Sequence, residues 1–348
     1  MGVFADLVQS VYSTYRQYLY TSLVILDLVW KRISKGEGYF RELTWPRPEI
    51  LDDGWHHKFV QLKNIKLHYV EEGPADGDVL VMVHGFPEFW YSWRFQLNHF
   101  KKTHRCLALD MRGYSESDKP RSQSQYHLTH LVEDIREFIE TLAPGKKVYL
   151  AAHDWGAIVC WRVALKYPEL LEKLIVFNVP HPTAFREVFM KSPEQRAKSW
   201  YIYFFQSPSI PELRMRLNKM EMLEKMFRSQ KAGIRNTQNF TDDDLLAWKY
   251  VFSQPDALTG PINYYRELFK PGTQITEKNV KVPVMIVWGD GDAFLDVRGA
   301  EGSKKYCEVS CQVEIVSGAS HWVQQDEPER VNELMEKFME SDAVSSKI

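Results

Sequence analysis

The sequence predicts an α/β fold, in which a mostly parallel sheet carries helices on both faces and a helical lid is inserted into the chain. Short apolar runs alternate with helix-like stretches, which is typical of a doubly wound sheet. One long block, residues 181–278, interrupts this rhythm with helical, aromatic-rich sequence. The chain has 348 residues, 44% of them hydrophobic, which is enough for one large core with an inserted subdomain.

The chain starts with an apolar leader, residues 1–45. Its most apolar part, residues 18–30, reads YLYTSLVILDLVW, which is short for a membrane span and is interrupted by Asp27. No small-residue cleavage site follows, so the leader does not fit a signal peptide. We expect a helix that either lies on a membrane surface or packs on the rest of the protein, with a true span as a third alternative. The protein is therefore expected on a membrane, such as that of the endoplasmic reticulum, or in the cytoplasm.

The strands follow a joint rich in proline and charge at residues 44–49. Two alternating segments, 57–62 and 65–71, predict an antiparallel pair. Continuous apolar runs predict strands buried on both faces of a parallel sheet, at 79–83, 105–109, 148–152, 174–177, 284–288 and 313–316. Helical patterns lie between them at 128–142, 156–167 and 328–339. We therefore divide the chain into a core, residues 46–180 and 279–348, and a lid, residues 181–278, over the strand ends that form the ligand crevice of such sheets.

A turn between a strand and a helix presents an unusual acidic residue. The run His153-Asp154-Trp155-Gly156 joins the strand at 148–152 to the next helix, which is the context of a nucleophile elbow. The usual pattern there is Gly-x-Ser-x-Gly, but here Asp154 takes the place of serine and Ala152 that of the first glycine. Small neighbours are needed because the turn is strained. The alternative is that Asp154 only caps the helix.

Three further loops argue that Asp154 is a nucleophile rather than a helix cap. The segment His84-Gly85-Phe86-Pro87 directly follows a strand, where a loop supplies one backbone N–H of an oxyanion hole. By position that donor is Phe86, and the second donor is Trp155, the residue after the nucleophile.

Strand ends nearer the C-terminus supply the partners of a nucleophile. Asp290 and Asp292 follow the next-to-last strand, and either could orient a histidine. His321 follows the last strand. The chain order of nucleophile, acid and histidine is that of a Ser-His-Asp type triad on a doubly wound sheet.

Taken together, these segments resemble the epoxide hydrolases of the α/β-hydrolase fold. The resemblance runs over residues 57–339, and the membrane-associated animal branch, which has an apolar leader, is the most similar, on residues 89–93 and 251–255. The segments that carry it are His84-Gly85-Phe86-Pro87-Glu88, Asp110-Met111-Arg112-Gly113-Tyr114, His153-Asp154-Trp155-Gly156 and Ser320-His321-Trp322.

The resemblance implies the remaining site residues. The family's two lid tyrosines correspond to Tyr201 and Tyr265, and its acid corresponds to Asp292 rather than Asp290. Tyr203 and Tyr264, which neighbour the two tyrosines, are then packing residues. The implied reaction turns an epoxide and water into a vicinal diol, with no metal and no organic cofactor.

An aspartate suits this chemistry. Attack on a saturated ring carbon by serine would leave an ether, whereas attack by Asp154 leaves an ester that water can hydrolyse. Tyr201 and Tyr265 would protonate the leaving oxygen, and His321, oriented by Asp292, would activate the water. The aromatic lid and apolar leader lead us to expect lipid-like substrates such as epoxidised fatty acids.

Other functions remain open from the sequence. A haloalkane dehalogenase uses the same aspartate, histidine and acid, and a non-catalytic interaction protein could retain the fold. A serine esterase does not fit the sequence, because no Gly-x-Ser-x-Gly occurs. The net charge of -2 does not indicate a nucleic-acid-binding protein. The cysteines suggest reduced thiols without zinc spacing: Cys106, Cys160, Cys307 and Cys311. Asn239 begins a glycosylation sequon that only a lumenal location could use.

Overall fold

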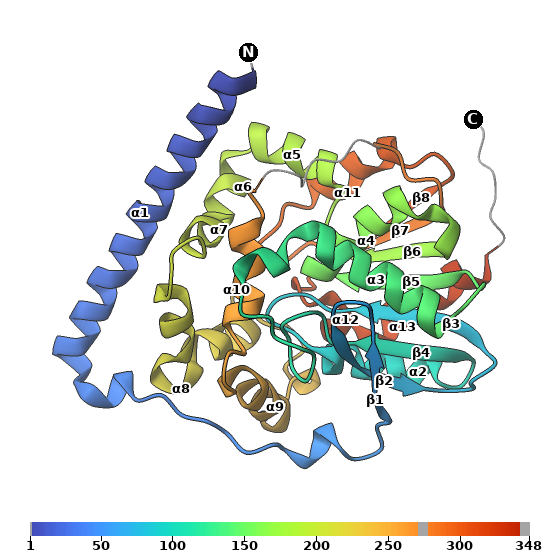
Figure 1. Ribbon diagram of the computed structural model, residues 1–348, viewed down its shortest axis with the longest axis horizontal. Coiled ribbons are helices and arrows are strands. Elements are labelled where there is room, and N and C mark those ends of the chain that lie inside the picture. The colour runs from blue at the N-terminus through green and yellow to red at the C-terminus, as the bar shows by residue number, and fades with distance from the viewer. Residues whose placement is uncertain (1, 271–277, 342–348) are drawn as a thin grey trace.

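The protein is built around one eight-stranded sheet, seen in a computed structural model that describes residues 2–270 and 278–341 (Figure 1). The strand order is β1-β2-β4-β3-β5-β6-β7-β8. The strands are β1 (His57–Gln61), β2 (Lys66–Glu72), β3 (Asp78–Val83), β4 (His104–Leu109), β5 (Val148–His153), β6 (Leu171–Phe177), β7 (Val284–Gly289) and β8 (Cys311–Val316).

The expected strand pattern is confirmed. β1 and β2 pair antiparallel, β2 pairs antiparallel with β4, and every later pairing is parallel. All residues of β7 are buried, and so are all but the first of β3, because helices cover both faces there. One expectation was wrong: β8 is an edge strand in which only Val316 is buried, and its Gln312 and Ile315 are exposed, so it is not covered on both faces.

Helices lie on both sides of the sheet (Figure 1). In α3 (Leu128–Leu142) the buried residues recur every three or four positions, which makes one apolar face. That face packs beside α4 (Asp154–Lys166), the helix that starts at the elbow. On the other side α2 (Arg94–Phe100) packs against β4 and α13 (Pro328–Glu340), and α12 (Val323–Asp326) follows the His321 loop. The small helix α11 (Arg298–Ser303) lies near β8.

Between β6 and β7 the described residues form helices and no strand. These helices are α5 (Pro182–Lys191), α6 (Pro193–Lys198), α7 (Trp200–Phe204), α8 (Ile210–Arg228), α9 (Asp242–Ser253) and α10 (Thr259–Glu267). The backbone of α8 is broken at residues 217–220, where three residues in a row have positive φ. Residues 271–277 of the expected lid and 342–348 of the expected core lie outside the described residues.

The leader forms one long helix, α1 (Gly2–Lys35), which runs along the side of the molecule where α7 lies (Figure 1). It contacts α7, where Tyr12 meets the ring of Tyr203 edge-on and Tyr20 packs against Trp200. Within residues 2–270 and 278–341, none of the helices combines the length and the apolarity that a membrane crossing requires. The large apolar side chains that α1 leaves exposed are Val11, Tyr12, Tyr15, Tyr18, Leu23, Ile25, Leu26, Val29, Trp30 and Ile33.

Candidate active site

Asp154 stands at the sharp turn between β5 and α4. Its φ of 47° lies in the left-handed region, which a side chain other than glycine adopts only at a cost. Two glycines make room for the turn. A Cβ at Gly85 would come within 2.3 Å of the Asp154 Cβ, and one at Gly156 would come within 2.3 Å of the Val83 carbonyl oxygen. A helix cap does not require such a strained and closely packed backbone, so capping alone does not explain Asp154.

The two carboxylate oxygens of Asp154 have different partners. Oδ1 accepts a hydrogen bond of 2.8 Å from the backbone N–H of Phe86, and Oδ2 lies 3.5 Å from Nε2 of His321. Burial alone would raise the pKa of Asp154, but His321 and the Phe86 N–H hold it below its usual value. The carboxyl group is therefore ionised at neutral pH, as a nucleophile must be.

The histidine is held by the acid that the resemblance indicated. His321 Nδ1 lies 2.7 Å from Oδ2 of Asp292. Asp292 is itself fixed, because Asn178 donates to Oδ2 and the backbone N–H groups of Phe294 and Leu295 donate to Oδ1. Asp290, the other candidate in the sequence, accepts instead from the backbone N–H of Gly318. The structure thus places Asp292, and not Asp290, against the imidazole.

His321 lies between two carboxylates. Burial lowers its pKa, but Asp292 and Asp154 outweigh burial and raise the pKa to about 10. Burial would raise the pKa of Asp292, yet His321 and Asn178 keep it below its usual value. In the free protein at neutral pH, therefore, His321 is an imidazolium between Asp154 and Asp292.

A cavity of about 230 Å³ opens above this group. Tyr201 from α7 and Tyr265 from α10 line it together with Asp154 and His321, and their ring centroids lie 6.0 Å apart. Burial, followed by the charge of Asp154, raises the pKa of both phenols. Both are therefore neutral hydrogen-bond donors at neutral pH.

The two neighbouring tyrosines face away from the cavity. Tyr264 donates its hydroxyl hydrogen to the carbonyl oxygen of Arg112, and Tyr203 stacks between Tyr20 and Phe269. Trp155 packs its ring against Tyr265, with centroids 5.0 Å apart. Asp154, His321, Asp292, Tyr201 and Tyr265 thus meet at one end of the sheet, with the two tyrosines contributed by α7 and α10.

One buried residue that ties this site together was missed from the sequence. Glu88 is fully buried and its Oε2 accepts from the Gly85 N–H and from His153 Nδ1. Its Oε1 accepts from the amides of Gln324 and Gln325.

The same network reaches the His321 loop. His153 Nε2 lies 2.8 Å from the carbonyl oxygen of His321, so Glu88 joins the loop after β3, the turn at Asp154 and the His321 loop. Asn178 was also missed. Its position directly after β6, at the sheet edge that carries Asp154 and Asp292, was the signal that could have found it.

Comparisons with known proteins agree with this geometry. The family model for the alpha/beta hydrolase fold matches residues 78–328. Epoxide hydrolase 2 of Caenorhabditis elegans is 63% identical over 344 residues, which cover 99% of this chain and 96% of that protein. Epoxide hydrolase 4 of Homo sapiens is 41% identical over 93% of this chain and 91% of that protein. A crystal structure of the Bacillus megaterium epoxide hydrolase with an inhibitor matches with a TM-score of 0.75 at 30% identity, over 82% of this chain and 100% of that one.

Proposed function

This chain belongs to the epoxide hydrolases of the α/β-hydrolase fold, and from that premise we propose that it converts epoxides to vicinal diols through an ester on Asp154. The observation that carries the proposal is the asymmetry of the Asp154 carboxylate. Oδ1 is already bonded to the Phe86 N–H, whereas Oδ2 has only His321 at 3.5 Å. Oδ2 is therefore the attacking oxygen, and Oδ1 becomes the carbonyl oxygen of the ester.

In the first step Oδ2 forms a bond to one ring carbon and the carbon–oxygen bond of the epoxide breaks. The leaving oxygen takes a proton from Tyr201 or Tyr265, which are neutral and line the cavity beside Asp154. Esterification removes the negative charge of Asp154, so the pKa of His321 falls from about 10. The imidazolium can then return a proton to the tyrosinate, which leaves a neutral base beside the ester.

In the second step His321 takes a proton from water, which attacks the carbonyl carbon of Asp154. Negative charge develops on Oδ1, where the Phe86 N–H stands at 2.8 Å. The N–H of Trp155 is the proposed second donor, and each such donor typically contributes about 3–4 kcal/mol. The tetrahedral intermediate expels the diol, and Asp154 and the imidazolium are restored without a metal or an organic cofactor.

The ester can be trapped. Replacing His321 by Gln removes the base of the second step but leaves Asp154, so incubation with an epoxide should add the epoxide mass to the peptide that contains Asp154. Intact and peptide mass spectrometry measure the adduct, and the double variant H321Q/D154N is the control that should stay unmodified. A broad epoxide panel that gives no adduct on Asp154 would overturn the mechanism. Parallel assays with haloalkanes should give no halide release, since the two lid tyrosines are suited to an alkoxide.

We further propose long-chain fatty-acid epoxides as the substrates. The cavity is lined mostly by apolar side chains, and Lys225 and Lys231, both exposed, lie at its outer part. An apolar channel with cations at its opening suits an acyl chain that ends in a carboxylate. The proposed lid, residues 181–278, supplies most of this lining.

A methyl ester tests the role of the carboxylate. We expect kcat/KM to be higher for a fatty-acid epoxide than for its methyl ester or for a small aryl epoxide, and the preference for the free acid to shrink in Lys231→Gln. Lys249→Gln, on α9 outside the cavity, is the matched control. Equal turnover of acid and methyl ester would exclude a carboxylate subsite.

The leader also enters the proposal. We propose that α1 lies on a membrane surface with its exposed apolar face toward the lipid. The opposite face of α1 packs on α7, whereas no described residues cover the exposed apolar face. The proposed lipid substrates are consistent with this placement.

A further inference from the structure

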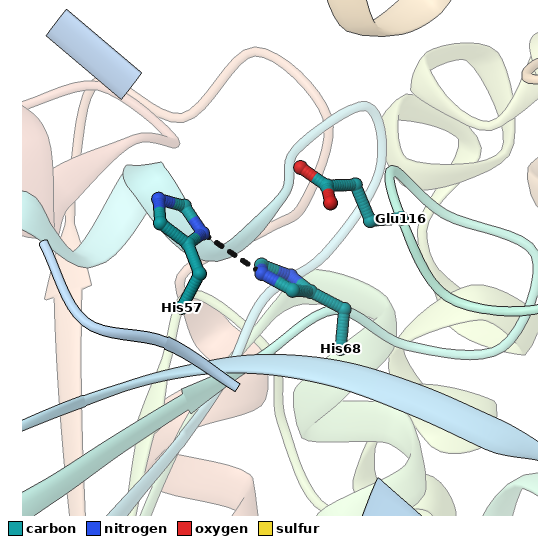
Figure 2. A group of neighbouring side chains, drawn as sticks. All are labelled: His57, His68 and Glu116. Carbon is teal, nitrogen blue, oxygen red and sulfur yellow. Dashed lines mark hydrogen bonds between the residues drawn. The ribbon is translucent and has the colours of Figure 1, made fainter. Parts of the chain in front are cut away.

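Three side chains with metal-binding atoms meet at the first two strands of the sheet. They are His57 at the start of β1, His68 in β2 and Glu116 in the loop after β4 (Figure 2). One ring nitrogen of each histidine and a carboxylate oxygen of Glu116 lie within 4.8 Å of one another. His68 is fully buried, His57 is partly buried and Glu116 is exposed, so the group is open to solvent on one side.

The outer nitrogen of each imidazole is already held by an acceptor. Nε2 of His57 lies 2.6 Å from the carbonyl oxygen of Leu51, and Nδ1 of His68 lies 2.7 Å from Oδ2 of Asp110. Each outer nitrogen therefore carries its proton, and the inner nitrogens of the two rings point at each other, 2.9 Å apart (Figure 2). A carboxylate behind a histidine is the usual support of a metal ligand, because it fixes the tautomer and makes the free nitrogen more basic.

The contact between the inner nitrogens has room for a proton or a cation. The chain from Leu51 through His57 and His68 to Asp110 contains three contacts at hydrogen-bond distance, and both of its ends are acceptors. Two neutral imidazoles bring only two N–H protons, so the geometry between the rings suits a third proton or a cation in its place.

We propose that His57, His68 and Glu116 bind a divalent transition-metal ion of the zinc type. Two imidazoles and one carboxylate form a donor set that zinc uses in proteins, with water as the fourth ligand. The nitrogens of a tetrahedral site lie about 3.3 Å apart, so the two rings separate by a few tenths of an ångström on binding. Binding displaces the shared proton, and the Glu116 side chain swings inward from the surface.

The charges around the group are compatible with a cation. Asp110 and Asp52 lie near the histidines, and Glu116 itself adds a third negative charge. Arg47 opposes binding, because it pairs with both Glu116 and Asp52. On binding, Arg47 keeps Asp52 and releases Glu116 to the metal.

The ion would fasten the first hairpin to the core. β1 touches the sheet only through β2, whereas Glu116 belongs to the loop whose Ser117 accepts from the His68 N–H and donates to the Asp110 carbonyl oxygen. A metal bound to both parts closes a link between the edge of the sheet and this loop. The site is independent of the chemistry proposed at Asp154, which requires no metal.

Titration of the metal-free full-length protein with Zn²⁺ tests the proposal. Calorimetry should show one site with a Kd on the order of micromolar, release of a proton seen as a dependence of the enthalpy on the buffer, and a rise in Tm. His57→Gln and Glu116→Gln should each weaken this binding by about tenfold or more. Neither variant alters the buried His68, so both are expected to fold.

The neighbouring histidine provides the control. His56→Gln removes an exposed imidazole that pairs with Glu72 outside the group, and it should bind Zn²⁺ as the parent does. With Co²⁺ the parent should show the visible band of a tetrahedral ion without a thiolate charge-transfer band, which excludes Cys307 and Cys311 as ligands. Absence of stoichiometric binding, or binding that His57→Gln leaves unchanged, overturns the proposal and leaves a shared proton between the rings.

Discussion

At the scale of single residues, Tyr265 gives the most specific prediction. A phenol that protonates the leaving group is suited to an alkoxide and not to a halide. We expect Tyr265→Phe to slow formation of the Asp154 ester by about 10²-fold, since it removes one of two proton donors, and to leave hydrolysis of the ester nearly unchanged. Single-turnover kinetics that separate the two steps measure both rates.

Tyr264→Phe is the matched control. Its hydroxyl bonds to the Arg112 carbonyl oxygen and not to the cavity, so the change should cost about 1 kcal/mol of stability and leave ester formation intact. Slower ester hydrolysis in Tyr265→Phe with unaltered ester formation would contradict the role assigned to Tyr265.

At the residue scale, the sequence could predict which side chains come together where they follow strands. Asp154 directly follows β5, and Asp292 and His321 lie in the loops after β7 and β8, so parallel strands bring all three to one edge of the sheet. Glu88 could not be assigned in this way. Its partners are a backbone N–H, a histidine and two glutamines from three separate segments of the chain, and only the folded chain shows that they converge.

At the scale of elements, the leader helix α1 has two unlike faces. Leu26 and Val29 are 64% and 52% exposed, whereas Leu28 between them is buried against Tyr39 and Leu217. If the exposed face rests on lipid, Leu26→Ser with Val29→Ser should weaken binding to neutral phosphatidylcholine vesicles by about tenfold or more, because apolar area is lost from the contact. Co-sedimentation with vesicles measures the change.

Phe59→Ser provides the comparison for this helix. Phe59 is exposed to a similar extent but lies on β1, so its replacement should leave vesicle binding as it was. A parent protein that stays in solution with these vesicles would show that α1 serves only to pack on the lid.

Elements were predicted well where their pattern was periodic and poorly where it depended on position in the sheet. The helix expected at 128–142 has those bounds in the structure, since its apolar face repeats regularly. The run at 313–316 gave a strand but the wrong burial. Whether a strand lies at the edge of the sheet depends on the topology, which the local sequence pattern does not predict.

At the scale of the whole molecule, the charge state of the site links stability to pH. The pKa of His321 is raised to about 10 in the folded protein from about 6.5 when unfolded. Its contribution is therefore fully present below about pH 6.5 and is lost as pH rises toward 10. We expect the free energy of unfolding of the parent, relative to His321→Gln, to decline over this interval.

Urea denaturation of both proteins at a series of pH values measures the difference. Other groups that titrate at alkaline pH affect both proteins alike and cancel. Parallel curves from pH 6.5 to 10 would show that His321 is not an imidazolium in the free protein.

The order of strands and helices was predictable in outline, because their patterns alternate and a helical block interrupts the alternation after β6. The contact between α1 and α7 was not, since nothing in residues 1–35 specifies which surface of the protein covers them. Likewise His57 and His68 were placed in neighbouring strands, but the loop that brings Glu116 to them is fixed only by tertiary contacts.

The short helix α7 constrains how this protein can evolve. Tyr201 faces the cavity, while Trp200 and Tyr203 on the same five-residue helix meet α1. Under the roles proposed for α1 and Tyr201, the leader and the reaction therefore depend on one short stretch of sequence. Substitutions that alter the proposed membrane contact would then also affect the proposed proton donor, so the two traits should diverge together among its relatives.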